Sequence, residues 1–147
     1  IAIGNRVGAN MQIHVQGGTA GAFRTYDGHQ PIESINVTTS TIDSMFGNSD
    51  IKLLKIDVDG FEDSVLEGAL ATLKRCTPLV FIEFHVSLMR EAGADPATLA
   101  RLFESMGYRN IVIWDNFGNF IKETQSYEEL LHIADSVPYY VDILFKP

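Results

Sequence analysis

One stretch of the sequence limits the fold more than any other, a nearly continuous apolar run at residues 51–58. Its hydrophobic residues are Ile51, Leu53, Leu54, Ile56 and Val58. Consecutive apolar residues are typical of a strand that is buried on both faces, as in a parallel sheet covered by helices. The run leads into Asp59-Gly60, which indicates a turn. We therefore expect an α/β unit to begin at this strand.

A helix is expected directly after this strand. Apolar residues recur at helical spacing from Phe61 to Leu73, the first turn is acidic, and two basic residues follow at the end. Charges in this order complement the helix dipole. Pro78 then stops the helix, and residues 79–84 form a second apolar run. The pattern predicts strand, helix and strand in succession.

The same alternation continues to the end of the chain. Asp95-Pro96 is an N-cap followed by a first-turn proline, and residues 111–114 predict a third strand. Ser126 and Glu129 form a capping box for another helix, and residues 140–145 predict a final strand. Strands that alternate with helices of this length imply parallel βαβ units and a doubly wound sheet.

Before residue 50 the pattern is one of strands and turns. Apolar and polar residues alternate at 11–16 and at 35–39, which predicts a hairpin-like excursion with one solvated face. The glycine-rich stretch 17–28 lacks GxGxxG spacing, so we interpret it as a loop and not as a phosphate cradle. No Pro- or Ser-rich linker divides the chain. We expect one domain over 1–147, with 1–50 and 51–147 as its two parts.

Composition and charge exclude several classes of function. The formal charge of −8 leaves no basic surface for nucleic acid, and no apolar run approaches the roughly 18 residues of a membrane span. The single cysteine, Cys76, cannot form an internal disulfide, which favours a reducing compartment and a cytoplasmic protein. The chain starts at Ile1 as if in mid-strand, which suggests trimmed N-terminal strands. A sheet edge exposed in this way would permit self-association.

Polar residues at the carboxyl ends of the strands are the candidates for a functional site, because ligands bind there in open α/β sheets. Asp57 ends a buried strand, where an unpaired charge is costly and no helix cap requires it. Asp59 and Glu62 fit either a capping box or a binding role. Glu83 interrupts the second buried strand, so it has to meet a donor, a cation or a ligand.

Two further residues follow strands. His85 lies two residues after Glu83, on the same face if the strand continues, and neutral imidazole is the usual general base near neutral pH. A hydrogen-bonding loop histidine is the alternative. Asp57, Glu83 and His85 could also hold a metal, but this set is a weak metal motif, and we predict none. Trp114, at the end of the third strand, is a weaker candidate.

The residues at these strand ends resemble the FkbM family of S-adenosylmethionine-dependent methyltransferases. The resemblance rests on Leu-Lys-Ile-Asp-Val-Asp-Gly-Phe-Glu at 54–62, on Val-Leu-Glu-Gly-Ala at 65–69, and on Ile-Glu-Phe-His at 82–85. The family usually has a glutamate where this chain has Asp59. Further matches that extend the resemblance over nearly the whole chain are Ala2-Ile3-Gly4, Thr41-Ile42-Asp43 and Val141-Asp142-Ile143-Leu144.

The resemblance implies a Rossmann-like methyltransferase fold, with a mostly parallel, doubly wound sheet, an antiparallel last strand and truncated N-terminal strands. It implies methyl transfer from S-adenosylmethionine to a hydroxyl group of a small molecule or sugar. The family's glycine-rich cofactor loop has no counterpart in this chain, which would carry the acceptor side of the site. By this resemblance, Asp57 would face the methyl-transfer centre, and Glu83 and His85 would line the acceptor pocket. We expect catalytic roles for Asp57 and His85, cofactor binding for Ala2 and Asp57, and acceptor binding for Asp59, Glu83 and Trp114.

Two other interpretations stay open. Asp57-x-Asp59 after an apolar strand resembles the opening motif of metal-dependent phosphatases of the haloacid dehalogenase type. Those enzymes have Thr or Val where this chain has Phe61, and the later acidic pair is not found. A chain without the glycine-rich loop could also be a non-catalytic fragment or a binding domain.

Overall fold

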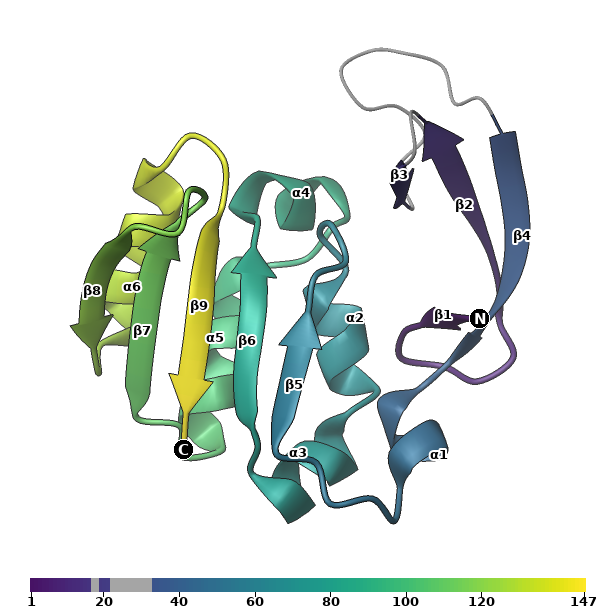
Figure 1. The fold of residues 1–147 in the computed structure, drawn as a ribbon, viewed down its shortest axis with the longest axis horizontal. Helices are drawn as coiled ribbons and strands as arrows, with labels where there is room; N and C mark the ends of the chain where they lie inside the picture. Colours follow the sequence, from purple (N-terminus) through teal and green to yellow (C-terminus); the bar gives the residue numbers. More distant parts are fainter. Residues whose placement is uncertain (17–18, 22–32) are drawn as a thin grey trace.

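The computed structural model describes residues 1–16, 19–21 and 33–147 (Figure 1). Its elements, in chain order, are β1 (Ala2–Ile3), β2 (Asn10–Gln16), β3 (Thr19–Gly21), β4 (Glu33–Ser40), α1 (Ile42–Phe46), β5 (Leu53–Ile56), α2 (Glu62–Glu67), α3 (Leu70–Cys76), β6 (Leu79–Phe84), α4 (Val86–Glu91), α5 (Pro96–Ser105), β7 (Asn110–Asp115), β8 (Phe120–Thr124), α6 (Tyr127–Ser136) and β9 (Val141–Lys146). The predicted glycine-rich loop at 17–28 lies outside the described residues, apart from the three that form β3.

The first part of the chain forms a four-stranded sheet in the order β1-β4-β2-β3. β2 and β4 are antiparallel and pair from Asn10 with Thr38 to Val15 with Glu33, which confirms the two strands predicted from alternation. Most side chains of β4 are exposed. This sheet therefore has a largely exposed strand, and Figure 1 shows it apart from the other strands.

The second part of the chain forms a five-stranded mixed sheet in the order β5-β6-β9-β7-β8. The last strand, β9, is antiparallel to both of its neighbours, as predicted. The prediction of a mostly parallel sheet is wrong for the described strands of this sheet, because β5–β6 is its one parallel pair of neighbours. The physical reason is that β9 enters between β6 and β7 and separates two strands that point the same way. A Rossmann-like arrangement stays a prediction.

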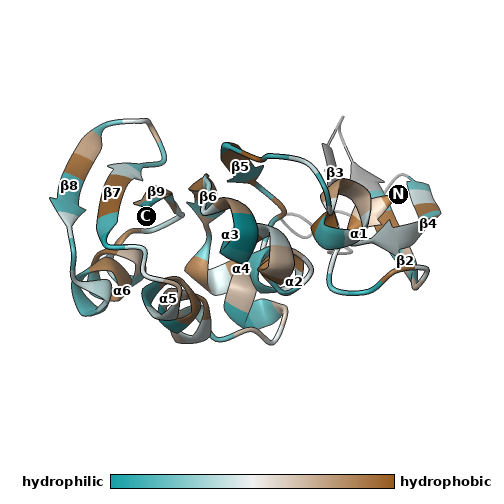
Figure 2. Cartoon of the chain, turned by 90° about the horizontal axis from the view of Figure 1, so that it is seen from below, coloured by the Kyte–Doolittle hydropathy of each residue, from teal (hydrophilic) through white to brown (hydrophobic). Residues whose placement is uncertain are grey.

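The helices cover one face of this sheet. Figure 2 shows α2 to α6 on the same side of the strands, so the doubly wound prediction is also wrong for the described residues. Burial along β6 follows this arrangement, because Val80, Ile82 and Phe84 are fully buried while Leu79 is 40% exposed. The apolar run at 51–58 is misleading for the same reason. Its apolar residues point to both faces, yet Leu53 is 59% exposed.

The core lies between the sheet and the helices. Phe103 of α5 stacks on Phe145 of β9 with ring centroids 4.0 Å apart, and Tyr108 meets Phe103 edge-on at 5.1 Å. The hydroxyl of Tyr108 donates to the carbonyl of Pro78 at 2.8 Å, so its polar end is satisfied. Each such aromatic side chain stabilises the fold by about 1.5–3 kcal/mol through burial. This layer fixes the positions of β6 and β9, which carry part of the site.

The single helix predicted over 61–73 is two helices, α2 and α3. A Cβ added to Gly68, at the end of α2, would lie 2.1 Å from the carbonyl oxygen of Gly4, so the chain packs closely against β1 there. The helix starts again as α3, and the Asp43 carboxylate accepts hydrogen bonds at 2.9 and 2.8 Å from two backbone N–H groups of its first turn. The break is stable because another segment caps the new helix.

The two helix starts predicted from local sequence are present. The Asp95 side chain accepts from the backbone N–H of Ala97 at 3.0 Å, and Ser126 Oγ accepts from the backbone N–H of Glu129 at 3.2 Å. The capping box predicted at Ser126 is only half formed, because the Glu129 carboxylate accepts from Lys122 and Thr124 and the Ser126 N–H donates to Thr124. The elements α4 and β8 have no counterpart among the predicted ones. None of the described helices is both long enough and apolar enough to cross a membrane.

Candidate functional site

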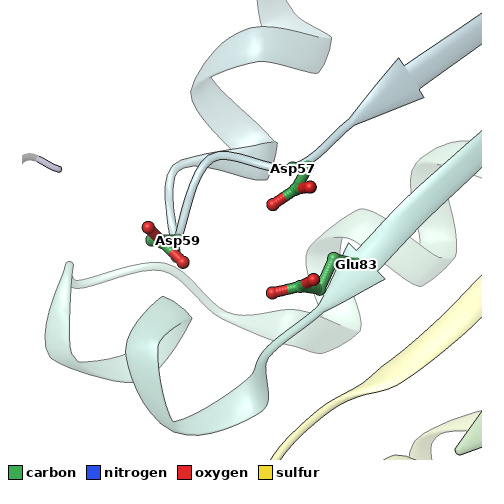
Figure 3. Close-up of side chains that lie close together, drawn as sticks. All are labelled: Asp57, Asp59 and Glu83. Carbon is green, nitrogen blue, oxygen red and sulfur yellow. The ribbon is translucent and has the colours of Figure 1, made fainter. Parts of the chain in front are cut away.

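Three carboxylates meet where β5 and β6 end. Asp57 directly follows β5, Glu83 is next to last in β6, and Asp59 lies in the turn before α2. Figure 3 shows the three side chains directed toward a common space. Each offers a carboxylate oxygen within 4.8 Å of the others. The parallel register of β5 and β6 brings these strand ends together, as the sequence predicts.

Asp57 is exposed and forms an ion pair with Lys55. The Lys55 Nζ lies 2.6 Å from Asp57 Oδ2, and this contact raises the pKa of the lysine. Lys55 is exposed while the next residue of β5, Ile56, is buried, so Lys55 lies on the open face of the strand. The ammonium group of Lys55 therefore lies beside the Asp57 carboxylate on this open face.

The turn that carries Asp59 has an unusual backbone. Asp59 has φ 50° and Gly60 has φ 96°, and a Cβ on Gly60 would lie 2.6 Å from the carbonyl oxygen of Leu88. The predicted Asp59–Glu62 capping box is absent, because the N-cap of α2 is Phe61 without a side-chain cap bond. Instead, Glu62 is fully buried and its Oε1 accepts from the Gly60 N–H at 3.0 Å. Burial raises the pKa of Glu62.

Glu83 has the most perturbed carboxyl group of this edge. Burial and three neighbouring negative charges together raise the pKa of Glu83 to about 7, and the charge of Lys55 acts against this shift. These charges belong to Asp57, Asp59 and Asp142. Glu83 therefore changes its charge near neutral pH.

Asp142 is a site residue that the sequence analysis does not predict. It is the direct cross-strand neighbour of Glu83 on β9, so both side chains project from the open face of the sheet. Burial raises the pKa of Asp142 as well. The sequence signal that could have found Asp142 is a carboxylate between two apolar residues of the final strand, Val141 and Ile143. Both of these neighbours are fully buried in the structure.

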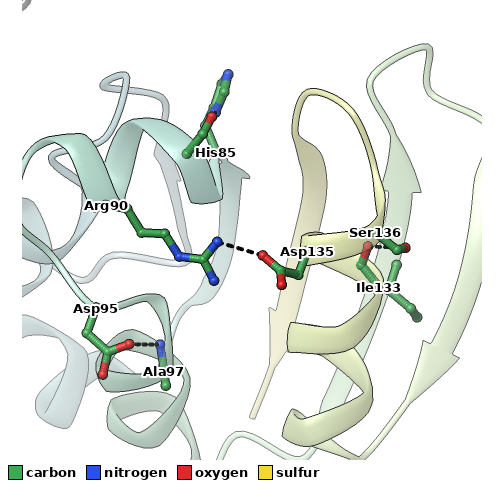
Figure 4. Close-up of polar contacts among 8 residues, drawn as sticks. His85, Arg90, Asp95, Ala97, Ile133, Asp135 and Ser136 are labelled. Atoms are coloured by element: carbon green, nitrogen blue, oxygen red, sulfur yellow. Dashed lines mark hydrogen bonds and ion pairs between the residues drawn. The ribbon is translucent and has the colours of Figure 1, made fainter.

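His85 lies at the N-cap of α4, because β6 ends one residue earlier. Its Nδ1 is 3.0 Å from Ser87 Oγ, and its ring centroid is 6.1 Å from that of Tyr140. Burial lowers the pKa of His85, which favours neutral imidazole at physiological pH, and the charge of Asp59 acts against this shift. Figure 4 shows the ring directed away from the Arg90–Asp135 ion pair beneath it.

The other two predicted site residues, Trp114 and Ala2, lie on strands other than β5 and β6. Trp114 is on β7, where it pairs with Asp142, so one strand separates it from Glu83. Its ring centroid is 6.2 Å from that of Phe81. Ala2 belongs to the other sheet, in which it pairs with Thr39.

The three carboxylates are the described residues whose spacing could accept a cation. Oxygen ligands suit hard divalent ions such as Mg²⁺. The set differs from the one considered from sequence, since Asp59 takes the place of His85. Exposed acidic groups often lie this close without a metal, and we assign none.

Comparison with protein families identifies the chain. A family model described as the methyltransferase FkbM domain matches residues 1–110, which include Asp57, Asp59, Glu83 and His85. Searches of curated proteins and of solved structures found no match. Since the family match spans 110 of the 147 residues, this chain belongs to the FkbM methyltransferase domain family.

Proposed function

We propose that this chain acts in S-adenosylmethionine-dependent methylation of a hydroxyl group on a small molecule or sugar. Membership of the FkbM family supports methyl transfer. The observation that carries the site is the convergence of Asp57, Asp59 and Glu83 at the end of the parallel β5–β6 pair. These residues belong to the same motifs on which the family resemblance rests.

The chemistry of this edge fits the cofactor. S-adenosylmethionine carries a sulfonium and an ammonium group, and when bound it supplies an electrophilic methyl group. Asp57 and its neighbouring carboxylates would attract these positive charges. A cavity of about 230 Å³ lies beside the end of β1, and its lining includes Asn5, Asn10 and Phe61, which offer amide groups and an aromatic ring. Ala2 would contribute to this side of the site through β1.

The chain's own residues would orient the acceptor and remove its proton. Positioning supplies much of the rate in a displacement of this kind, and a base adds to it. Asp57 and His85 are the proposed catalytic residues. The lowered pKa of His85 favours a neutral ring, and its Nδ1 lies 3.0 Å from Ser87 Oγ, while Asp57 would face the methyl-transfer centre. Asp59, Glu83 and Trp114 would contact the acceptor, and Glu83 is a third candidate for the base.

The test measures binding first and transfer second. Calorimetric titration with S-adenosylmethionine should show binding, and Asp57→Asn should weaken it by roughly tenfold. The matched control is Asp50→Asn, which breaks the exposed Asp50–Lys52 ion pair away from the site. With labelled cofactor and a panel of sugars and small alcohols, Asp57→Asn or His85→Asn should lower methyl transfer by about 100-fold.

Each outcome of this test has a definite meaning. If both variants transfer the methyl group as fast as the parent chain, the catalytic assignment is wrong. If neither this chain nor a version extended at its N-terminus binds the cofactor, the proposed function fails and a non-catalytic domain is favoured. Magnesium-dependent hydrolysis of p-nitrophenyl phosphate, lost in Asp57→Asn, would favour the phosphatase alternative.

A further inference from the structure

The Glu83 carboxylate has negatively charged neighbours on two sides. On one side, the antiparallel register places it directly opposite Asp142. On the other side, Asp57 and Asp59 each bring an oxygen within 4.8 Å of its carboxylate group. Carboxylates directly opposite each other in a sheet repel, and the like charges around Glu83 disfavour its ionised form.

The groups that face Glu83 come from each element around it. Lys55 and Asp57 belong to β5 and its end, Asp59 to the following turn, and Asp142 to β9. Burial raises the pKa of Tyr140, just before β9, and the charge of Glu83 adds to this shift. Lys55 carries the positive charge of this set, and its Nζ forms an ion pair with Asp57 Oδ2 at 2.6 Å.

The same contacts separate Glu83 from the other two candidates for the base. The Asp57 carboxylate already accepts a hydrogen bond from Lys55 at 2.6 Å, so one of its oxygens is engaged. His85 lies outside β6, and Nδ1 of its ring is engaged with Ser87. Glu83 combines partial burial with a ring of negative charges, which is the environment that makes a carboxylate a stronger base.

We propose that Glu83 takes the proton from the acceptor hydroxyl, and that Asp142 is a positioning residue that acts through Glu83. This inference rests on the methyl-transfer function proposed above. An oxygen lone pair of the acceptor forms the new C–O bond, and the S–C bond breaks with its electron pair going to sulfur. The hydroxyl proton passes to a carboxylate oxygen of Glu83. The products are a methyl ether, the neutral thioether and protonated Glu83, which then releases its proton to water.

The first experiment needs no acceptor. Titration of the 147-residue chain, followed by the ¹³C NMR signal of the Glu83 carboxyl carbon, should give a midpoint near pH 7. Asp142→Asn should lower this midpoint by about half a unit or more, and Asp142→Glu should restore it. Glu128→Gln, an exposed charge on α6, is the matched control and should leave the midpoint unchanged. An ordinary glutamate midpoint, or no shift in Asp142→Asn, would overturn the proposal.

The second experiment follows the rate against pH, with labelled S-adenosylmethionine and an acceptor from the panel above. The rate should rise through the Glu83 midpoint, Asp142→Asn should move this rise to lower pH, and Glu83→Gln should lower kcat by about 100-fold. An unchanged kcat in Glu83→Gln, or a profile that Asp142→Asn does not move, refutes the role of Glu83. If neither the parent chain nor a version extended at its N-terminus binds the cofactor, the proposed function is refuted instead.

Discussion

Glu83 links the chemistry of the sheet edge to the stability of the fold. Its pKa rises from the ordinary value of 4.5 to about 7, so the folded chain holds this proton more tightly than the unfolded chain does. A group of this kind stabilises the fold fully below its unfolded pKa, and the contribution is lost as the pH rises through its folded pKa. Burial shifts the pKa of Glu62 and of Asp142 in the same direction. The site therefore opposes folding when it is fully charged.

The free energy of unfolding should consequently fall between pH 4.5 and pH 8. Over this interval the free energy of unfolding of Glu83→Gln, whose side chain cannot ionise, should fall by about 1–2 kcal/mol less than that of the parent chain, after allowance for solvent screening. Urea unfolding at pH 5 and at pH 8 measures the difference. Equal losses in the two proteins would show that Glu83 does not carry a raised pKa. Glu128→Gln serves again as the control for a change of net charge.

At the scale of elements, the break between α2 and α3 depends on Asp43. The Asp43 carboxylate accepts from the backbone N–H groups of Ala71 and Thr72, and these contacts hold the pKa of Asp43 below its usual value although burial acts in the opposite direction. Its own helix, α1, is capped by Thr41, whose side chain accepts from Ser44 N–H. The Thr-Ile-Asp segment therefore joins α1 to α3 through hydrogen bonds.

Removal of this cap should destabilise the chain. Asp43→Ala should lower the free energy of unfolding by about 1–2 kcal/mol, because two N–H groups at the start of α3 lose their acceptor. Asp43→Asn keeps one acceptor oxygen and should cost about half as much. Urea denaturation at pH 7 measures both values. Asp63→Ala, in the first turn of α2, removes the same charge without touching α3, and a cost equal to that of Asp43→Ala would argue against the cap.

Local sequence could predict the features that depend on local contacts. The caps at Asp95 and Ser126 and the meeting of Asp57 with Glu83 follow from spacing and from the strand-end rule. The helix break could not be predicted, since the apolar spacing continues through Gly68 and the reason for the break is a neighbour more than sixty positions earlier. The place of Asp142 in the site could not be predicted either, because only the β6–β9 register places it opposite Glu83.

At the scale of the whole molecule, the described chain has a core on one side of its larger sheet. The helix-facing residues of β6 and β9 are fully buried, while several apolar residues elsewhere on the sheet stay exposed (Figure 2). Hydropathy alone could not separate these groups, since Leu53 and Ile56 have the same character and differ only in the face they occupy. Phe120, at 63% exposure, is a further example on β8.

Two substitutions on one strand test this arrangement. Ile82→Ala should lower the free energy of unfolding by about 2–5 kcal/mol, because Ile82 is fully buried against the helices. Leu79→Ala, on the open face of the same strand and 40% exposed, should cost less than about 1 kcal/mol. Thermal and urea unfolding provide the values. Similar costs at the two positions would mean that the open face is covered in solution.

The turn at Asp59 and Gly60 has a consequence for binding affinity. Left-handed backbone at a residue with a side chain costs roughly 1–2 kcal/mol, and here the buried Glu62 holds the turn in that conformation. The backbone that carries the Asp59 carboxylate is thus set during folding, before any ligand arrives. A molecule that binds at this edge would lose little chain entropy on contact, so weak individual contacts could add up to a specific complex.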